Sequence, residues 1–192
     1  MVIDTSHTLL HTLVKERPVD GHKGTFGHAL LVSGSYGMAG ACILAGKGCM
    51  RSGVGKLTIH TPRLNNDIIQ ISLPEAIMHH DLDGNAWTCV LHSCSMYNAI
   101  GIGPGIGKHA KTAEALHETL IALQEENIPM VMDADALNLL AGHPEWSSLL
   151  PENTILTPHP LEYHRLMDAG FDMERLILVL KGHPTSICIP NS

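Results

Sequence analysis

The stretch ALLVSGSYGMAGACILAGKGCMRSGVGKLTIHTP (residues 29–62) contains one complete strand–helix–strand unit. Residues 29–35 form an apolar run that ends in Gly and Ser, as a buried strand followed by a tight turn does. Residues 40–53 form a small-residue helix with apolar groups on every side, which predicts that this helix is buried. Residues 55–62 are again strand-like. Two strands joined through a helix indicate a parallel pair and an α/β fold.

The same alternation continues to the end of the chain. We expect further strands at residues 98–103, 128–134, 153–160, 176–182 and 185–190, and further helices at residues 108–123, 135–142 and 161–170. Residues 68–96 favour a short helix and a loop, in which MHHD (78–81) is a solvated turn. This order of elements predicts a doubly wound, mainly parallel sheet in a single domain over residues 1–192.

Composition excludes several classes of function. The chain has 192 residues and a net charge of −7, which argues against a general affinity for nucleic acid or for an anionic membrane. Its first residues lack the pattern of a signal peptide, and no apolar run approaches the roughly 18 residues of a membrane span. The five cysteines contain no CxxC pair and are expected to be reduced thiols. We therefore expect a cytoplasmic protein.

The residues that suggest chemistry follow the predicted strands. In a doubly wound sheet the ligand lies beyond the carboxyl ends of the strands, so these segments are expected to meet on one rim. They are GSYGMAGA (34–41), GPGIG (103–107), DADALN (133–138), TPHPLE (157–162) and KGHPT (181–185).

The glycine-rich run AIGIGPGIGKHA (99–110) matches neither of two familiar phosphate-binding patterns. A dinucleotide fingerprint would need Gly at Ile106, and a P-loop would need Gly at Ile102 and a hydroxyl at His109. The glycines of the two loops either satisfy tight turns with positive φ or expose N–H groups at helix N-termini, where the dipole favours phosphate. These glycines are Gly40, Gly103, Gly105 and Gly107.

The other rim residues have two interpretations each. Asp135 is either the N-cap of the helix that follows or a site residue, and Asp133 suits a metal or a hydroxyl as well as a structural role. His159, held between two prolines, is either structural or a ligand contact. Lys181 suits an ordinary exposed cation or a partner of phosphate, and Thr185 either joins it or caps the hairpin. No nucleophile elbow, H-E-x-x-H pair or zinc-spaced Cys/His set is present.

Five motifs in order resemble the ADP- or ATP-dependent NAD(P)H-hydrate dehydratases. They are HKGTFGHALLVSGSYGMAGA (22–41), IGIGPGIG (100–107), VMDADALNLLA (131–141), ILTPHPLE (155–162) and LVLKGHPT (178–185). The resemblance implies a ribokinase-like fold of three layers, with helices on both faces of the sheet. It also implies a homo-oligomer.

The resemblance implies that hydrated NADH or NADPH is phosphorylated on its ring hydroxyl by ADP or ATP, with Mg²⁺, and that phosphate then leaves. Substrate contacts carried over by motif are Ala41, one glycine of GPGIG (Gly105 or Gly107) and His159. Nucleotide contacts carried over by motif are Lys181, Gly182, His183, Pro184 and Thr185. Asp133, Asp135 and Asn138 lie in a family motif without an assigned role. The choices between ADP and ATP and between the two hydrates stay open.

Two departures from the family pattern accompany this resemblance. The family's Gly-Gly-Ser-Gly-Asp motif, whose Asp is the general base, lies beyond Ser192, and residues 168–182 leave little room for an additional helix found in the family. We therefore expect an incomplete domain that does not perform the full reaction alone, with a bare apolar sheet face and a tendency to self-associate. A ribokinase-like kinase of a small alcohol and a non-catalytic nucleotide-binding module are the alternatives.

Overall fold

The computed structural model describes residues 16–81 and 84–190. Their strands form one eight-stranded sheet in the order β3-β2-β1-β4-β5-β6-β7-β8. The strands are β1 (His28–Val32), β2 (Lys56–Pro62), β3 (Ile77–Asp81), β4 (Ala99–Ile102), β5 (Met130–Met132), β6 (Ile155–Leu156), β7 (Ile177–Leu180) and β8 (Ser186–Cys188). The helices are α2 (Ala39–Arg51), α3 (Asn66–Ser72), α4 (Ala110–Leu123), α5 (Asp135–Gly142) and α6 (Pro160–Asp168), with 3₁₀ turns η1 (Arg63–Asn65) and η2 (Pro144–Leu149).

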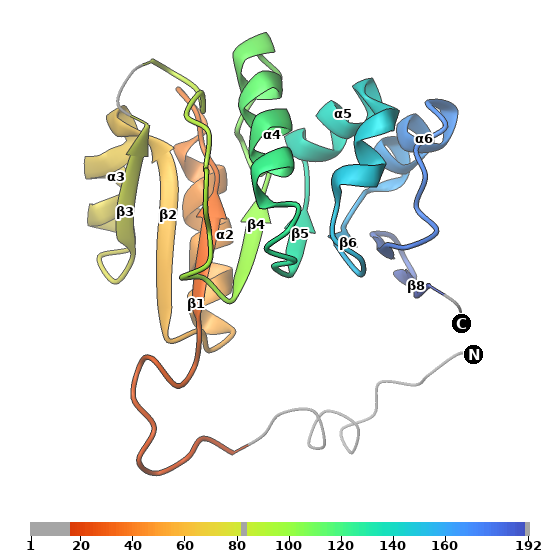
Figure 1. Ribbon diagram of the computed structural model, residues 1–192. Coiled ribbons are helices and arrows are strands. Elements are labelled where there is room, and N and C mark those ends of the chain that lie inside the picture. Colours follow the sequence, from red (N-terminus) through yellow and green to blue (C-terminus); the bar gives the residue numbers. More distant parts are fainter. Residues whose placement is uncertain (1–15, 82–83, 191–192) are drawn as a thin grey trace.

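The sheet is parallel except at one edge, where β8 pairs antiparallel with β7. From β1 the chain moves outward through β2 to β3, and it then crosses back to add β4 on the other side of β1. Figure 1 shows β3 and β8 at opposite ends of the sheet. This reversal of direction creates a topological switch point between β1 and β4, where open α/β sheets bind their ligands. The predicted doubly wound sheet and its hairpin strand are confirmed.

The alternation of side chains along the strands separates two apolar cores. Leu30 and Val32 of β1 join the larger core, beneath α4, α5 and α6, whereas Leu31 joins the smaller one beneath α2 and α3. Figure 1 shows α4 in front of the sheet and α2 behind it. Helices therefore lie on both faces, as expected for three layers, although α2 and α3 cover only the part of their face formed by β1 to β3.

Helix α2 is less buried than its composition predicts. It places Ala39, Cys42 and Gly46 against the sheet, while Leu44 on its outer side is 75% exposed. The expectation of an enclosed helix is therefore wrong for that side, because α3 is the one described helix that packs beside α2 on this face. Among the described residues, no helix combines the length and the apolar character that crossing a membrane requires.

The segment MHHD (78–81) is part of strand β3, so the prediction of a solvated turn there is wrong. Strand β3 pairs in parallel with β2, with His79 opposite His60. Asp81, only 3% exposed, accepts hydrogen bonds from the backbone N–H groups of Thr88 and Cys89. The carboxylate thereby anchors the irregular residues 84–98, which cover this end of the sheet. The short helix and the loop expected within residues 68–96 are present as α3 and as this covering segment.

Candidate functional site

Two glycine-rich loops meet at the switch point between β1 and β4. The Gly34 N–H donates to the carbonyl of Pro104 over 2.9 Å, and the Ser33 hydroxyl donates to the same carbonyl. The loop after β1 is thus joined to the loop after β4 through backbone groups. The two glycine-rich loops are far apart in the sequence, but they are in direct contact at the carboxyl edge of the sheet.

The helices that follow these loops begin without side-chain caps. Neither Met38 at the start of α2 nor His109 at the start of α4 makes a side-chain capping bond. Their first backbone N–H groups have no partner within the helix and carry the positive end of the helix dipole. Both helices follow strands that end at the carboxyl edge of the sheet, and amides at such N-termini are suited to a phosphate or a pyrophosphate.

Two of the predicted substrate contacts, Ala41 and Gly105, are brought together here. Gly105 has φ +71°, and a Cβ atom at this position would lie 2.9 Å from the Met38 Cβ and 3.1 Å from the Ala41 Cβ. Gly105 therefore lets the second loop pack directly on the first turn of α2. The positive-φ interpretation holds for Gly103, Gly105 and Gly107, whereas Gly40 is an ordinary helical residue of α2.

Asp135 is not the N-cap of α5. That position belongs to Ala134, which has φ +52°, and the Asp135 carboxylate instead accepts a hydrogen bond from the Gly107 N–H over 3.0 Å. The N-cap interpretation is therefore wrong, because a side chain on the first helical turn reaches the neighbouring loop. The bond couples the loop after β4 to the helix after β5.

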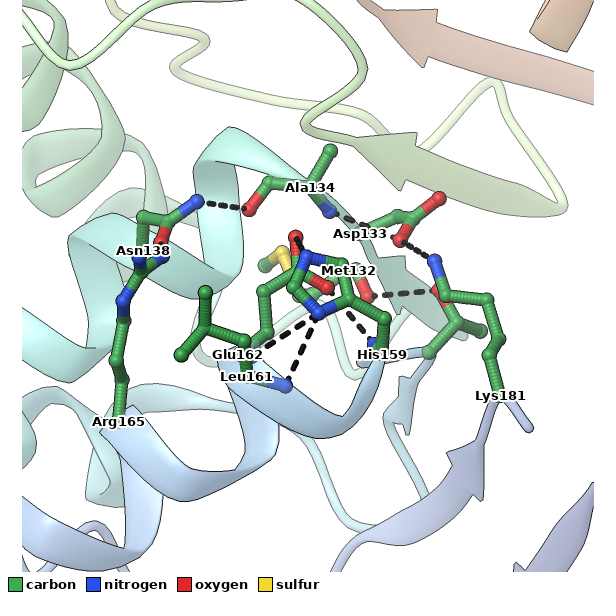
Figure 2. A network of polar contacts seen from close by, with 10 residues as sticks. Met132, Asp133, Ala134, Asn138, His159, Leu161, Glu162, Arg165 and Lys181 are labelled. Atoms are coloured by element: carbon green, nitrogen blue, oxygen red, sulfur yellow. Dashed lines mark hydrogen bonds and ion pairs between the residues drawn. The ribbon is translucent and has the colours of Figure 1, made fainter.

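Asp133 and Lys181 form an ion pair at the ends of β5 and β7 (Figure 2). The Lys181 Nζ lies 2.7 Å from the Asp133 Oδ1, which also accepts the Ala134 N–H over 2.9 Å. The backbone N–H of Lys181 donates to the carbonyl of Pro158 over 2.8 Å. These bonds connect the ends of β5, β6 and β7. Because the side chains are 34% and 45% exposed, the pair is accessible to a ligand.

His159 caps helix α6 rather than pointing freely into the rim. Its Nδ1 accepts the N–H groups of Leu161 and Glu162, and the Glu162 carboxylate accepts the His159 N–H over 2.9 Å (Figure 2). This reciprocal capping box occupies the first free amides of α6. The imidazole remains 47% exposed, so its surface is still available to a ligand. Glu162 is assigned no role in the sequence analysis. Its position three residues after the cap residue is nevertheless the spacing of a capping box.

Asn138 connects α5 with α6. Its Nδ2 donates to the Ala134 carbonyl over 3.1 Å, and its Oδ1 accepts from the Arg165 guanidinium over 2.6 Å. Figure 2 shows this chain of contacts beside the Asp133 pair. Arg165 carries no sequence signal, because its partner lies 27 residues earlier on another helix. Both residues stabilise the arrangement that holds Ala134 in its unusual conformation.

The segment KGHPT (181–185) forms the exposed turn of the β7–β8 hairpin. The Thr185 hydroxyl donates to the Gly182 carbonyl over 3.2 Å, so the capping interpretation holds for this residue. The turn starts at the same edge as the glycine loops and presents the cationic Lys181 there.

Neither a cysteine nucleophile nor a metal centre built from protein side chains is supported at this edge. Burial raises the pKa of the Cys42 thiol, below the first loop, to about 11, so it is not a thiolate at neutral pH. Within residues 16–81 and 84–190, no group of three or more His, Cys, Asp or Glu side chains is placed to hold a metal ion. The site therefore offers backbone amides, one ion pair and a half-exposed imidazole.

Comparisons with known proteins agree with this geometry. A family model described as NAD(P)H-hydrate dehydratase matches residues 29–183. An ADP-dependent (S)-NAD(P)H-hydrate dehydratase from Bacillus subtilis is 36% identical over 193 residues, which cover 92% of this chain and 65% of that protein. A bifunctional NAD(P)H-hydrate repair enzyme from Coxiella burnetii is 36% identical over 155 residues, which cover 81% of this chain and 30% of that enzyme.

Solved structures show the same fold. A ribokinase-like superfamily protein from Enterococcus faecalis superposes with a TM-score of 0.80 at 25% identity, covering 97% of this chain and 68% of that one. The Bacillus subtilis ADP/ATP-dependent NAD(P)H-hydrate dehydratase, co-crystallised with ATP/Mg²⁺, superposes with a TM-score of 0.73 at 34% identity, covering 93% of this chain and 66% of that one. The expected ribokinase-like fold is therefore confirmed.

Proposed function

The chain belongs to the NAD(P)H-hydrate dehydratase family, and from that premise we propose that it acts in the nucleotide-dependent repair of hydrated NADH or NADPH. The phosphoryl group of ADP or ATP is transferred to the ring hydroxyl, so a P–O bond forms there as the P–O bond to the nucleotide breaks. Phosphate then leaves with the electrons of the C–O bond, and a ring carbon gives up a proton as the double bond forms. This order replaces a poor leaving group, hydroxide, with a good one.

The uncapped N-termini of α2 and α4 are the observation that carries this proposal. A dinucleotide has a pyrophosphate, and two helix dipoles beside a switch point favour such an anion over a neutral ligand. In this proposal Ala41, Gly105 and Gly107 contact the substrate where the two loops pack together. His159 contacts it through the exposed part of its imidazole ring, since Nδ1 accepts amides of α6 and Nε2 lies 3.4 Å from the Glu162 carboxylate.

The nucleotide donor lies over the β7–β8 turn, where residues 181–185 contact its phosphates. The ammonium of Lys181 supports this role because it stands at the sheet edge, half exposed, and is held by a single carboxylate. A phosphate that approaches Lys181 replaces or shares that carboxylate as its partner. Catalysis of phosphoryl transfer rests mainly on positioning and on stabilisation of charge.

The residues of the rim fit Mg²⁺ to a limited extent. Mg²⁺ is usually bound through one or two carboxylates together with substrate phosphates and waters. Asp133 supplies a carboxylate beside Lys181, whereas the Asp135 carboxylate already accepts the Gly107 N–H. In this proposal the ion is held mostly by the nucleotide phosphates, with Asp133 as the protein ligand, and it supplies neutralisation of phosphate charge. Assembly into a homo-oligomer and a cytoplasmic location remain parts of the proposal.

Calorimetric titration with ADP and with hydrated NADPH tests the proposal. Both are expected to bind, and Lys181→Met is expected to lower the affinity for ADP by about tenfold or more, because a charge-assisted contact to phosphate is lost. Lys23→Met is the matched control, since Lys23 is an exposed lysine on the loop before β1, away from the carboxyl edge. Equal ADP affinity in the Lys181 variant and the control would contradict the assigned role.

A turnover assay separates this function from its alternatives. Recovery of the near-ultraviolet absorbance of the reduced nicotinamide ring, dependent on ADP or ATP with Mg²⁺, supports repair. Phosphorylation of a small alcohol instead supports a kinase, and binding of both ligands without turnover by the complete protein supports a nucleotide-binding module. The same assay on residues 1–192 tests the prediction that this segment does not perform the full reaction alone.

A further inference from the structure

A cavity lies at the carboxyl edge on the far side of the first glycine loop from β4. It has a volume of about 780 Å³, which falls within the range of small-ligand pockets. It lies where β2 and β3 end, and its lining includes Arg63, Asn66, Asp67, His80 and Asn85. None of the family motifs quoted above includes these residues.

Hydrogen bonds join the walls of this cavity to the first glycine loop. The Tyr36 N–H, in that loop, donates to the Asn85 carbonyl over 2.6 Å. The buried Asn65 side chain, in the turn that carries Arg63, donates to the Thr61 hydroxyl over 3.0 Å and to the Ser35 carbonyl over 3.4 Å. The cavity and the loop at the switch point are therefore parts of one continuous edge. Adjacent strands lie about 4.8 Å apart, so β2 and β3 end roughly 10–15 Å from β4.

The cavity presents one cation that lacks a protein acceptor. Arg63 is exposed and lines the cavity, and among the described residues its guanidinium makes no hydrogen bond or ion pair. An anion that enters the cavity would pair with this guanidinium. His80 also lines the cavity, but its Nδ1 is buried beneath the surface. Asp67 is the opposing charge, and its carboxylate accepts a bond from the Asn66 amide over 2.8 Å.

We propose that this cavity binds the ribose phosphate that distinguishes NADPH from NADH, so that hydrated NADPH is the preferred substrate. The inference rests on the proposed function, which places the dinucleotide on the glycine loops. The pyrophosphate lies at the N-termini of α2 and α4, and the adenosine end extends along the sheet edge toward Arg63. An arginine beside the ribose is a known means of accommodating a 2′-phosphate, because its planar fork matches phosphate oxygens.

Titration calorimetry with NADP⁺ and NAD⁺ tests this inference directly, since both are stable and differ only in that phosphate. The wild-type protein is expected to bind NADP⁺ about tenfold more tightly or better. Arg63→Gln is expected to abolish the preference by weakening NADP⁺ binding alone. Asp67→Asn is expected to strengthen NADP⁺ binding by a few fold, because a like charge is removed. Arg51→Gln, at the far end of α2, is the matched control and leaves both affinities unchanged.

Three results would overturn the inference. Equal affinity for NADP⁺ and NAD⁺ in the wild-type protein would do so and would leave the proposed repair function intact, because either hydrate then serves as substrate. A preference that survives Arg63→Gln would place the phosphate elsewhere. Binding of adenosine 2′-phosphate that depends on Arg63, with no binding of either dinucleotide, would show an anion site unconnected to the glycine loops and would contradict the proposed substrate as well. Circular dichroism of each variant confirms that the exposed substitutions leave the fold intact.

Discussion

The rim formed by β1 and β4 to β7 is held together largely through backbone amide donors, whereas the edge at β2 and β3 is held by buried polar side chains. On the rim, the amides of Gly34, Gly107 and Lys181 donate across the loops. At the edge, the Asp81 carboxylate anchors the covering segment, and the buried His60 meets His79 with their Nδ1 atoms 3.2 Å apart. The closely packed glycines of the rim leave no room for an added side chain, whereas the stability of the edge depends on the protonation of its buried histidines.

The largest effect is expected from Gly103→Ala, which tests the backbone construction of the rim. Gly103 has φ +136°, and an added Cβ would overlap the carbonyl oxygen of Asp133 in the adjacent loop. We expect the free energy of unfolding to fall by about 4 kcal/mol or more, measured by urea denaturation. Gly48→Ala is the control, since Gly48 lies in α2 with open space around it, and it is expected to change stability by at most about 1 kcal/mol, in the stabilising direction. Similar losses in both variants would contradict the comparison.

The next effect is a loss of stability in acid that originates at the edge. Burial lowers the pKa of His60 from its ordinary 6.5 to about 4, with the charge of His79 acting in the same direction and Asp81 opposing it. Between these values the unfolded chain binds a proton that the folded chain does not, so stability falls as pH decreases from about 6.5 to about 4, by about 3 kcal/mol from this residue. The pKa of His28 and of His80 is also lowered by burial, which adds to the same trend.

Urea denaturation across this pH range provides the measurement. In His60→Gln the unfolding free energy is expected to depend less on pH. In His92→Gln, an exposed position on the covering segment, the pH dependence of the wild-type protein is expected to remain. An unchanged slope in His60→Gln would show that the acid sensitivity arises elsewhere.

A smaller loss is expected when the anchor of the covering segment is weakened. Asp81→Asn removes the charge that accepts the Thr88 and Cys89 N–H groups, and we expect a loss of about 2 kcal/mol in unfolding free energy. Hydrogen exchange is expected to accelerate in residues 84–98 and at Tyr36, whose N–H donates to the Asn85 carbonyl, and to stay unchanged in residues 103–107. Asp168→Asn, an exposed carboxylate at the end of α6, provides the control and is expected to change stability by less than about 0.5 kcal/mol. Faster exchange in residues 103–107 would show that the covering segment also stabilises the second glycine loop.

The smallest effect on stability is expected from Asp133→Asn on the rim. Its ion pair with Lys181 is half exposed, so its loss is expected to lower stability by less than about 1 kcal/mol, and added salt should reduce the difference further. The same denaturation experiment at low and high salt measures this. A loss of 2 kcal/mol or more would mean that side chains, and not only backbone, hold the rim together.

The rim was predictable because its signals are local. Glycines at residues 103–107, the strand end at Asp133, and the Lys181 turn each follow directly from a strand that the apolar pattern identifies. The capping box of His159 and Glu162 is equally local, and its spacing makes it detectable from the sequence, although His159 alone is assigned a role in the sequence analysis. Parallel strands bring such ends to one edge, so the convergence of these segments follows from the order of elements.

The edge at β2 and β3 was not predictable in the same way. Strand β3 lies at the border of the sheet, and its sequence of two histidines and an aspartate lacks the apolar pattern of a strand. Its pairing depends on β2, and the burial of Asp81 depends on residues 84–98 folding back over it. Likewise, Asp135 reaches Gly107 and Arg165 reaches Asn138 across the fold, where no spacing rule applies.

The sequence by itself determined the alternation of strands and helices, the positions of the loops and the family, because these depend on periodicity and on residues adjacent in the chain. The tertiary structure alone decided which loops touch, that α2 and α4 present uncapped N-termini at one switch point, and that Arg63 and His80 share a cavity. The physical reason is that hydrogen bonding and burial act between neighbours in space, and a chain of this length brings together residues whose separation in sequence gives no sign of their contact.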